Sequence, residues 1–426
     1  MKLYKNPSRE SWSELLLRPA MSIEEIEKQV QPILKAVQNE GDAALRAFSL
    51  QFDRADIDSF LVSNEEFEEA EKLVAPELKE SISIAIENIT KFHAAQKTET
   101  LKVETMKGIQ CWRKSVPIQK VGLYIPGGTA PLFSTVIMIG APALIAGCEE
   151  VFLCTPPNSE GKIHPAILYA AKKIGLTKVF KVGGAQAIAA MTYGTESIPK
   201  VSKIFGPGNQ YVTAAKQLAT KEGIAIDMPA GPSEVLVWAD DTAHPSFIAA
   251  DLLSQAEHGT DSQVILVSSS EETIRKTEEE LEKQLAVLPR QEIARKALNN
   301  SRSFLIEDEA TALDLVNEYA AEHLILSLSN AEEVAEKIIN AGSVFVGHYT
   351  PESAGDYASG TNHTLPTYGY AKNYSGVSLD SYYRKITFQK IDKEGLKTLG
   401  PHVERMAAAE ELDAHKNAIT VRLKEC

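Results

Sequence analysis

Short runs of β-branched and aromatic residues alternate with helical segments along the chain from about Val121 onward. The apolar runs form two series, at 150–154, 178–182 and 203–205 and then at 234–238, 263–267 and 303–306. Such alternation is typical of βαβ units, in which parallel strands form a sheet whose two faces are covered by helices. We therefore predict an α/β fold with two doubly wound, Rossmann-like parallel sheets and a cleft between them.

The two ends of the chain carry helical patterns instead. In the N-terminal part, apolar residues recur at spacings of three and four, which is typical of amphipathic helices. Ser22 with Glu25, and Ser63 with Glu66, fit capping boxes that satisfy unpaired backbone donors where a helix begins. After about Ser378 the chain returns to charged segments, which we interpret as a helical tail without a core of its own.

Composition limits the class of protein. A chain of 426 residues is too long for one ordinary core. The net charge of −14 argues against a nucleic-acid binder, which needs clustered Lys and Arg. The four cysteines have no CxxC spacing and are expected to be free thiols. The opening residues lack an apolar signal core, and no apolar run is long enough to cross a bilayer. We expect a cytoplasmic protein that binds neither nucleic acid nor membrane.

Four glycine- and proline-rich turns follow predicted strands, at 124–128, 182–186, 205–209 and 228–233. In open α/β sheets, ligands bind outside the carboxyl ends of strands, where glycine lets the backbone approach them closely. Helix starts at such turns also offer free N–H groups to phosphate. None of the turns is GxGxxG. Any one of them is an ordinary βα turn, but four together favour a nucleotide or substrate cleft.

Four side chains in the second half of the chain could hold a metal. Gln255 and His258 are three residues apart, so they share one face of a predicted helix. Asp356 and His363 lie in a segment rich in glycine and serine. Nitrogen and oxygen ligands of this kind are compatible with zinc. Taken singly, each has a simpler explanation, as a histidine at a helix end or as a solvated loop residue.

Glu322 and His323 lie between a helical stretch and an apolar run, at an element end where active-site residues often emerge. Histidine titrates near neutral pH and can accept a proton from an alcohol. A neighbouring glutamate can activate water. His415 lies on a predicted exposed helix, and its spacing alone gives it the least support.

Long segments of this sequence resemble the histidinol dehydrogenases. They include Gly-Leu-Tyr-Ile-Pro-Gly-Gly at 122–128 and the segments at 205–212, 226–235, 254–263, 321–324 and 352–369. The resemblance extends from the N-terminal helices to the tail near His415. It implies oxidation of L-histidinol through L-histidinaldehyde to L-histidine, the last step of histidine biosynthesis, with NAD and one zinc ion per subunit.

The resemblance also implies roles for individual residues of this chain. The implied zinc ligands are Gln255, His258, Asp356 and His415. Glu322 and His323 match the catalytic pair. The implied substrate contacts are Ser233, His363 and Glu410, together with His323 and the four zinc ligands. The implied NAD contacts are Tyr124, Gln186 and Asn209. The family forms homodimers in which the tail of one subunit completes the partner's site, so His415 is expected to act across the interface.

On this basis we expect four parts. Residues 1–24 form an N-terminal extension, and residues 25–125 and 235–378 form a discontinuous α/β domain with the zinc and catalytic residues. Residues 126–234 form an inserted α/β domain that lines the NAD and substrate cleft. Residues 379–426 form the tail that completes the partner's site.

Three alternatives remain. The first is a paralogous zinc-dependent NAD dehydrogenase of another primary alcohol, such as a sulfonated diol; the acidic Glu410 and neutral His363 disfavour an anionic substrate. The second is an enzyme with a cysteine nucleophile, for which Cys111 and Cys154 are the candidates. The third is a protein that keeps the fold but has lost its chemistry, which the intact Glu322–His323 pair disfavours.

Overall fold

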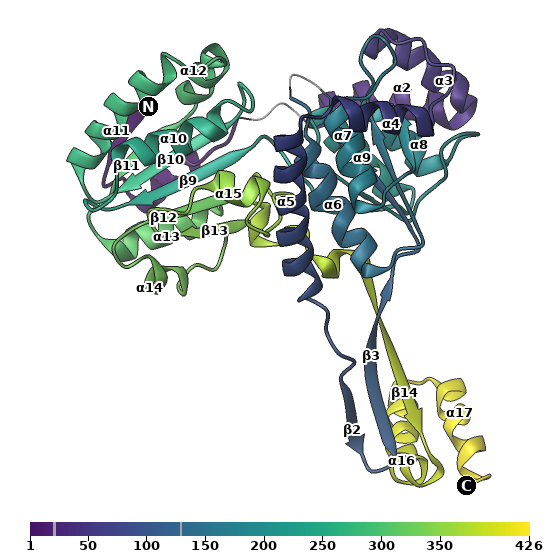
Figure 1. Cartoon of the computed structure of the whole chain (residues 1–426). Coiled ribbons are helices and arrows are strands. Elements are labelled where there is room, and N and C mark those ends of the chain that lie inside the picture. The colour runs from purple at the N-terminus through teal and green to yellow at the C-terminus, as the bar shows by residue number, and fades with distance from the viewer. Residues whose placement is uncertain (20–22, 128–129) are drawn as a thin grey trace.

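The computed structural model describes residues 1–19, 23–127 and 130–426. Two lobes, each built on a parallel sheet, lie next to each other, and an arm projects away from them (Figure 1). Ser22 of the first predicted capping box and Gly128 of the first glycine-rich turn lie outside the described residues.

The first lobe contains a six-stranded parallel sheet in the order β1-β11-β10-β9-β12-β13. Its strands are β1 (Lys2–Lys5), β9 (Glu234–Ala239), β10 (Gln263–Ser268), β11 (Arg302–Leu305), β12 (His323–Ser327) and β13 (Ser343–Val346). Side chains alternate between the two faces of a strand. Val235 and Val237 therefore pack on one face of the sheet, and Leu236 and Trp238 pack on the other.

Helices cover both faces of this sheet. One face carries α10 (Pro245–Ala256), α11 (Glu271–Leu285) and α12 (Gln291–Asn299). The other carries α1 (Trp12–Leu15), α13 (Glu309–Tyr319) and α14 (Ala331–Ala335). The short helix α15 (Glu352–Tyr357) follows β13 and contacts α10.

The second lobe contains a five-stranded parallel sheet in the order β6-β5-β4-β7-β8. Its strands are β4 (Lys120–Tyr124), β5 (Glu150–Thr155), β6 (Val179–Lys181), β7 (Lys203–Phe205) and β8 (Ala225–Ile226). One face is covered by α4 (Asn64–Leu73), α5 (Pro76–Ala94), α6 (Phe133–Ala146) and α7 (Pro165–Ile174). The other face is covered by α2 (Ile23–Glu40), α3 (Asp42–Phe48), α8 (Gly184–Tyr193) and α9 (Gln210–Lys221).

The arm combines segments from distant parts of the sequence. It contains the antiparallel strands β2 (Lys102–Met106), β3 (Ile109–Pro117) and β14 (Tyr383–Ile391), and the helices α16 (Lys393–Ala409) and α17 (Asp413–Leu423). Short helical turns lie at Arg9–Ser11, Ser49–Asp53, Tyr370–Lys372 and Leu379–Tyr382. Within the described ranges, no helix is both long and apolar enough to cross a membrane.

The predicted α/β class with two parallel sheets is confirmed. The capping box at Ser63 is confirmed as well. Ser63 Oγ accepts the backbone N–H of Glu66 at 3.3 Å, and Glu66 Oε2 accepts that of Ser63 at 2.9 Å.

The structure divides the chain differently from our expectation. The helices between residues 23 and 94 pack on the second sheet, not with residues 235–378, because apolar side chains such as Val30 and Ile89 lie in its two core clusters. The start of the expected N-terminal extension is β1, an edge strand of the first sheet. The expected helical tail begins with the strand β14, whose apolar Ile386 and Phe388 alternate with polar neighbours in period two.

Segment 356–382 joins the two lobes. Asn362 Nδ2 donates to the carbonyl of Met138 on α6 at 2.6 Å. Tyr382 is fully buried, donates its hydroxyl to the carbonyl of Ile139 at 2.7 Å, and stacks on Phe205 with ring centroids 4.1 Å apart. The chain that leaves the first lobe is thus fastened into the core of the second.

Replacing Tyr382 tests this connection. Tyr382→Ala removes a buried ring and should lower the free energy of unfolding by about 3–5 kcal/mol. Tyr382→Phe keeps the ring and loses only the hydroxyl, so it should cost about 1–2 kcal/mol. Urea unfolding followed by tryptophan fluorescence measures both. Equal losses of unfolding free energy in the two variants would show that the hydroxyl, and not the ring, makes the main contribution.

Candidate active site

The expected catalytic pair and three of the four expected metal ligands meet at the amino-terminal edge of the first sheet. Glu322 and His323 stand at the start of β12. Gln255 lies in the last turn of α10 and His258 just beyond it; α10 runs antiparallel to the strands, which places its C-terminal end at the same edge. Asp356 comes from α15. The βα topology brings these residues together although they are far apart in the sequence.

Gln255, one of the residues at this edge, is completely buried. Its Nε2 lies 3.2 Å from the carbonyl oxygen of Glu234 and 3.3 Å from Oε2 of Glu322. Its Oε1 is buried and accepts no hydrogen bond. A buried acceptor without a donor is costly, and an amide oxygen in this position fits a cation. The sequence-based choice of Gln255 as a possible metal ligand is therefore compatible with its environment.

His323 is held at both ring nitrogens. Its Nδ1 lies 3.2 Å from the carbonyl oxygen of Glu234, and its Nε2 lies 3.1 Å from Oδ1 of Asp356. The carbonyl and the carboxylate are both acceptors, so Nδ1 and Nε2 each donate a hydrogen in this arrangement. The ring stacks on Phe345 at 5.8 Å. Burial alone would lower the pKa of His323, but the charge of Glu322 and the hydrogen bond to Asp356 outweigh it and raise the pKa.

Glu322 lies next to this ring and is almost fully buried. Its Oε2 accepts the backbone N–H of Glu234 at 2.9 Å. Burial raises the pKa of Glu322 to about 8, against the opposing charge of His323. A carboxyl group with a pKa in this range exchanges protons near neutral pH, as a general acid or base must.

Two further histidines lie close to Asp356. His363 Nδ1 lies 2.8 Å from the backbone carbonyl of Asp356, and its Nε2 lies 3.0 Å from Oγ1 of Thr135 on α6. His363 thus forms hydrogen bonds with residues of both lobes. Burial lowers the pKa of His258, while the charge of Asp356 opposes this shift. Ser233 immediately precedes β9 and is half-buried.

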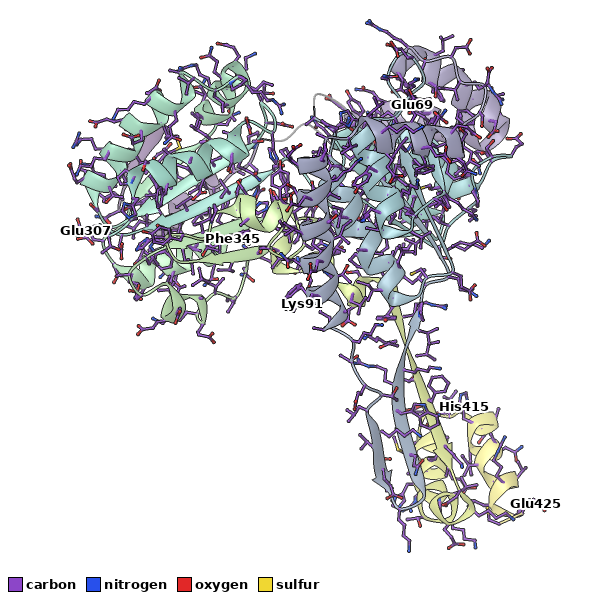
Figure 2. All side chains as sticks on the ribbon, viewed as in Figure 1. Glu69, Lys91, Glu307, Phe345, His415 and Glu425 are labelled. Carbon is purple, nitrogen blue, oxygen red and sulfur yellow. The ribbon has the colours of Figure 1, made fainter. Side chains whose placement is uncertain are left out.

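Two expected site residues are not brought to this site within one chain. Glu410 ends α16, and His415 lies on α17, so both belong to the arm. Figure 2 shows His415 on the arm, whereas Phe345, the ring next to His323, lies in the first lobe. Among the described residues, no three His, Cys, Asp or Glu side chains group together as a metal site.

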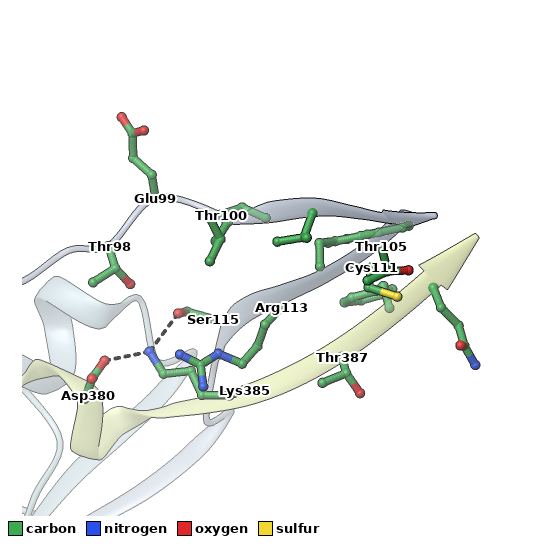
Figure 3. A pocket seen from close by; sticks show the side chains of 15 residues that line it. Thr98, Glu99, Thr100, Thr105, Cys111, Arg113, Ser115, Asp380, Lys385 and Thr387 are labelled. Carbon is green, nitrogen blue, oxygen red and sulfur yellow. Dashed lines mark hydrogen bonds and ion pairs between the residues drawn. The ribbon is translucent and has the colours of Figure 1, made fainter. Parts of the chain in front are cut away.

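The arm carries a cavity of about 860 Å³ between its strands (Figure 3). Leu101, Val103, Trp112 and Phe388 line it, and the rings of Trp112 and Phe388 stack at 5.3 Å. The side chain of Leu101 is 73% exposed. The other lining residues are mostly polar or charged, among them Thr100, Arg113 and Lys385, so the surface is mixed in character.

A second cavity, of about 790 Å³, lies at the carboxyl edge of the second sheet. Tyr124 at the end of β4 and Asn209 after β7 both line it. The strand order reverses between β4 and β7, the position where open α/β sheets bind ligands. Tyr124 Oη accepts the backbone N–H of Gly184 at 3.1 Å. Gln186 lies two residues further along α8 and is buried, but it is not among the residues that line this cavity.

This cavity has two features of a nucleotide site. A Cβ atom at Gly127 would lie 2.2 Å from Pro156, so only glycine permits this close backbone approach. The N-cap residue Gly183 supplies no side-chain cap to α8, and of the first backbone donors only that of Gly184 is used by a side chain, Tyr124; such a helix start suits an anion. Asp53 lines the cavity, and its Oδ2 is buried without a hydrogen-bond partner. Burial raises the pKa of Asp53 to about 6.

Several residues of the site were not found from the sequence. Glu234 touches Gln255, Glu322 and His323 through its backbone. Glu352 is buried, accepts Ser254 Oγ at 2.6 Å, and has a pKa raised by burial to about 8. Both are in the segments at 226–235 and 352–369 that carry the resemblance. Backbone contacts and burial leave no pattern in a single sequence, and so neither residue stood out.

The four cysteines are free, as predicted. Cys154 is completely buried on β5, and burial raises the pKa of its thiol. Cys111 lies on the arm, in a different part of the fold from Glu322 and His323. A thiolate nucleophile therefore has no support beside Glu322 and His323.

Known proteins match this chain over almost its whole length. The family model for histidinol dehydrogenase matches residues 16–423. Histidinol dehydrogenase of Bacteroides thetaiotaomicron is 61% identical over 423 residues, or 99% of each chain. The Escherichia coli K12 enzyme is 52% identical over 417 residues, covering 97% of this chain and 95% of that protein. The crystal structure of histidinol dehydrogenase from Elizabethkingia anophelis matches 100% of this chain and 98% of its own, with 54% identity and a TM-score of 0.98. The chain therefore belongs to the histidinol dehydrogenase family, and the enzyme is an oxidoreductase of histidine biosynthesis.

Proposed function

We propose that the enzyme oxidises L-histidinol to L-histidinaldehyde and then to L-histidine, with two NAD⁺ and one zinc ion per subunit. The reaction balances as one alcohol, one water and two NAD⁺ giving one carboxylate, two NADH and three protons. The observation that carries the proposal is the buried, unpaired Oε1 of Gln255 beside the acid–base pair Glu322 and His323.

Gln255, His258 and Asp356 from one subunit, with His415 of the other, are the proposed zinc ligands. The set of nitrogen and oxygen donors suits zinc. Bound there, zinc would hold the imidazole and amine of histidinol and so orient the alcohol. Ser233, His363 and Glu410 are the proposed further substrate contacts.

His323 is the proposed base for the alcohol proton. The carbonyl of Glu234 keeps the hydrogen on Nδ1, so Nε2 is the nitrogen that would exchange a proton, and it would be free to accept one when Asp356 binds the metal instead of the ring. Glu322 is the proposed base for the water that attacks the aldehyde. Its position next to the ring of His323 lets one pair of residues serve both oxidation steps.

NAD is the proposed occupant of the cavity at the second sheet. Tyr124 and Asn209 line this cavity, and the uncapped start of α8 suits the pyrophosphate. Asn209 Oδ1 already accepts the N–H groups of Tyr211 and Val212, so its Nδ2 is the group free to donate to the cofactor. Gln186 is the third proposed contact.

The proposed assembly is a homodimer in which each arm completes the partner's site. His415 and Glu410 lie on the arm, away from the other proposed ligands. Helix α17 buries no residue within its own chain. The apolar side chains exposed on the arm would be covered by a second copy.

The first test is the reaction itself. L-histidinol should yield two NADH per molecule consumed, and a chelator should abolish NADH formation until zinc is added back. Circular dichroism of the metal-free enzyme serves as the control for unfolding. Full activity after zinc has been shown to be absent by elemental analysis would exclude the metal site. One NADH per substrate would reduce the reaction to an alcohol oxidation.

A mixed dimer tests the shared site. Glu322→Gln and His415→Asn should each be inactive as homodimers. After subunit exchange, each mixed dimer has one site with both intact residues, so activity should return to about a quarter of wild type. The control mixes Glu322→Gln with the double variant Glu322→Gln/His415→Asn, which has no intact Glu322 and should stay inactive. No recovery in the first mixture would place His415 in the site of its own chain.

Replacing Asp53 tests the proposed NAD site. Its unpaired Oδ2 is expected to accept a ribose hydroxyl of the cofactor. A hydrogen bond to a charged group contributes about 1.5–3 kcal/mol, so Asp53→Asn should weaken NADH binding about tenfold or more. NADH fluorescence titration measures the Kd without turnover. Asp58→Asn, at a nearby exposed carboxylate, is the control and should bind as wild type. Equal Kd values for both variants would remove Asp53 from the cofactor site.

A further inference from the structure

One peptide of the first sheet supports three residues of the proposed site. The backbone N–H of Glu234 donates to Oε2 of Glu322 at 2.9 Å. The carbonyl oxygen of Glu234 accepts from Nδ1 of His323 and from Nε2 of Gln255, each at 3.2 Å. A small displacement of the Glu234 backbone would therefore move the proposed base, the proposed water activator and one proposed ligand together.

The side chain of Glu234 fixes this peptide in place. The carboxylate is 1% exposed. Arg18 binds both of its oxygens, with Nε at 2.6 Å from Oε1 and Nη2 at 3.0 Å from Oε2. The backbone N–H of Tyr368 also donates to Oε1, at 2.6 Å. The fork of an arginine matches a carboxylate in this bidentate way, and lysine cannot reproduce it.

Arg18 is itself held by residues that are far away in the sequence. Its Nη2 donates to the backbone carbonyl of Tyr319 at 2.6 Å, and its guanidinium lies 4.0 Å from the centre of the Tyr319 ring. The ring of Tyr368 lies 6.0 Å away on the loop that follows His363. Arg18 thus ties the N-terminal segment, the end of α13 and this loop to the start of β9.

We propose that Arg18 is a positioning residue of the active site, which holds Glu322 and His323 in their catalytic geometry through Glu234. Arg18 contacts none of the proposed substrate or zinc residues directly. The inference depends on the proposed roles of Glu322 and His323. Without Arg18, the carboxylate of Glu234 would be a buried charge without a cation, and it would have to shift or take up a proton.

The test compares two arginines of the same N-terminal segment. Arg18→Ala should lower kcat by about 10- to 100-fold, because a misplacement of about 1 Å has an effect of this size. The KM for histidinol and the Kd of NADH should stay close to wild type, since the cofactor cavity and three of the four proposed ligands do not contact Glu234, and kcat is expressed per bound zinc because Gln255 can move with Glu234. Guanidinium chloride at low concentration should restore part of kcat to Arg18→Ala and none to Glu322→Gln. Arg9→Ala is the control, because Arg9 pairs with exposed Asp314 and lies over the ring of Trp12 without contacting Glu234, and it should retain wild-type kcat.

Arg18→Lys covers the case in which the alanine variant does not fold. It retains the charge but loses the fork, and kcat should fall by about 3- to 10-fold. Wild-type kcat in Arg18→Lys or Arg18→Ala would overturn the inference. So would a loss of kcat that follows zinc content or that guanidinium does not relieve. A wild-type enzyme inactive on histidinol would instead refute the proposed function, so the two failures can be told apart.

Discussion

The crossing of segment 356–382 from one lobe to the other is the constraint on which the site depends. The proposed acid–base pair lies at the amino edge of the first sheet, and the cofactor cavity lies at the carboxyl edge of the second. His363 bonds to the backbone of Asp356 on one side and to Thr135 of α6 on the other. Because Asn362 and Tyr382 anchor the same segment in the second lobe, the two sheet edges are held at a fixed distance and orientation. The proposed hydride transfer between substrate and NAD requires a fixed geometry of this kind.

The buried glutamates of the first lobe differ in whether a cationic side chain pairs with them. Glu234 has a buried arginine partner, Arg18. Glu322 and Glu352 are equally buried, yet among the described residues neither pairs with a lysine or arginine. Burial raises the pKa of each to about 8. Buried acids without a cation are expensive to keep. Glu322 Oε2 lies 3.3 Å from Nε2 of Gln255, so an acid without a lysine or arginine partner stands beside the residue whose buried Oε1 has no hydrogen bond, an arrangement that suits the proposed cation site.

The arm has a different physical character from the lobes. In the described residues, helices do not cover both faces of its three-stranded sheet as they do in the two parallel sheets, and apolar side chains such as Leu101 and Met406 stay exposed. A thin sheet of this sort is stable when another surface covers it. The arm also carries Glu410 and His415. The exposed apolar surface and the residues proposed to act in the partner's site therefore belong to the same part of the fold.

The sequence by itself determined the α/β class, six of the eleven strands in the two parallel sheets and the βα turns, because these depend on local periodicity and on glycine. It also indicated Glu322 and His323 as a pair at an element end, and Gln255 and His258 as neighbours on one helix face. The assignment of helices 23–94 to the second sheet was decided only in three dimensions, since an amphipathic helix does not encode which sheet covers its apolar face. The same holds for strand β14, whose partner β3 is more than 250 residues away in the chain. The role of Glu234 and Arg18 also emerged only from the tertiary structure, because a buried ion pair and backbone hydrogen bonds depend on which distant residues meet, not on any local pattern.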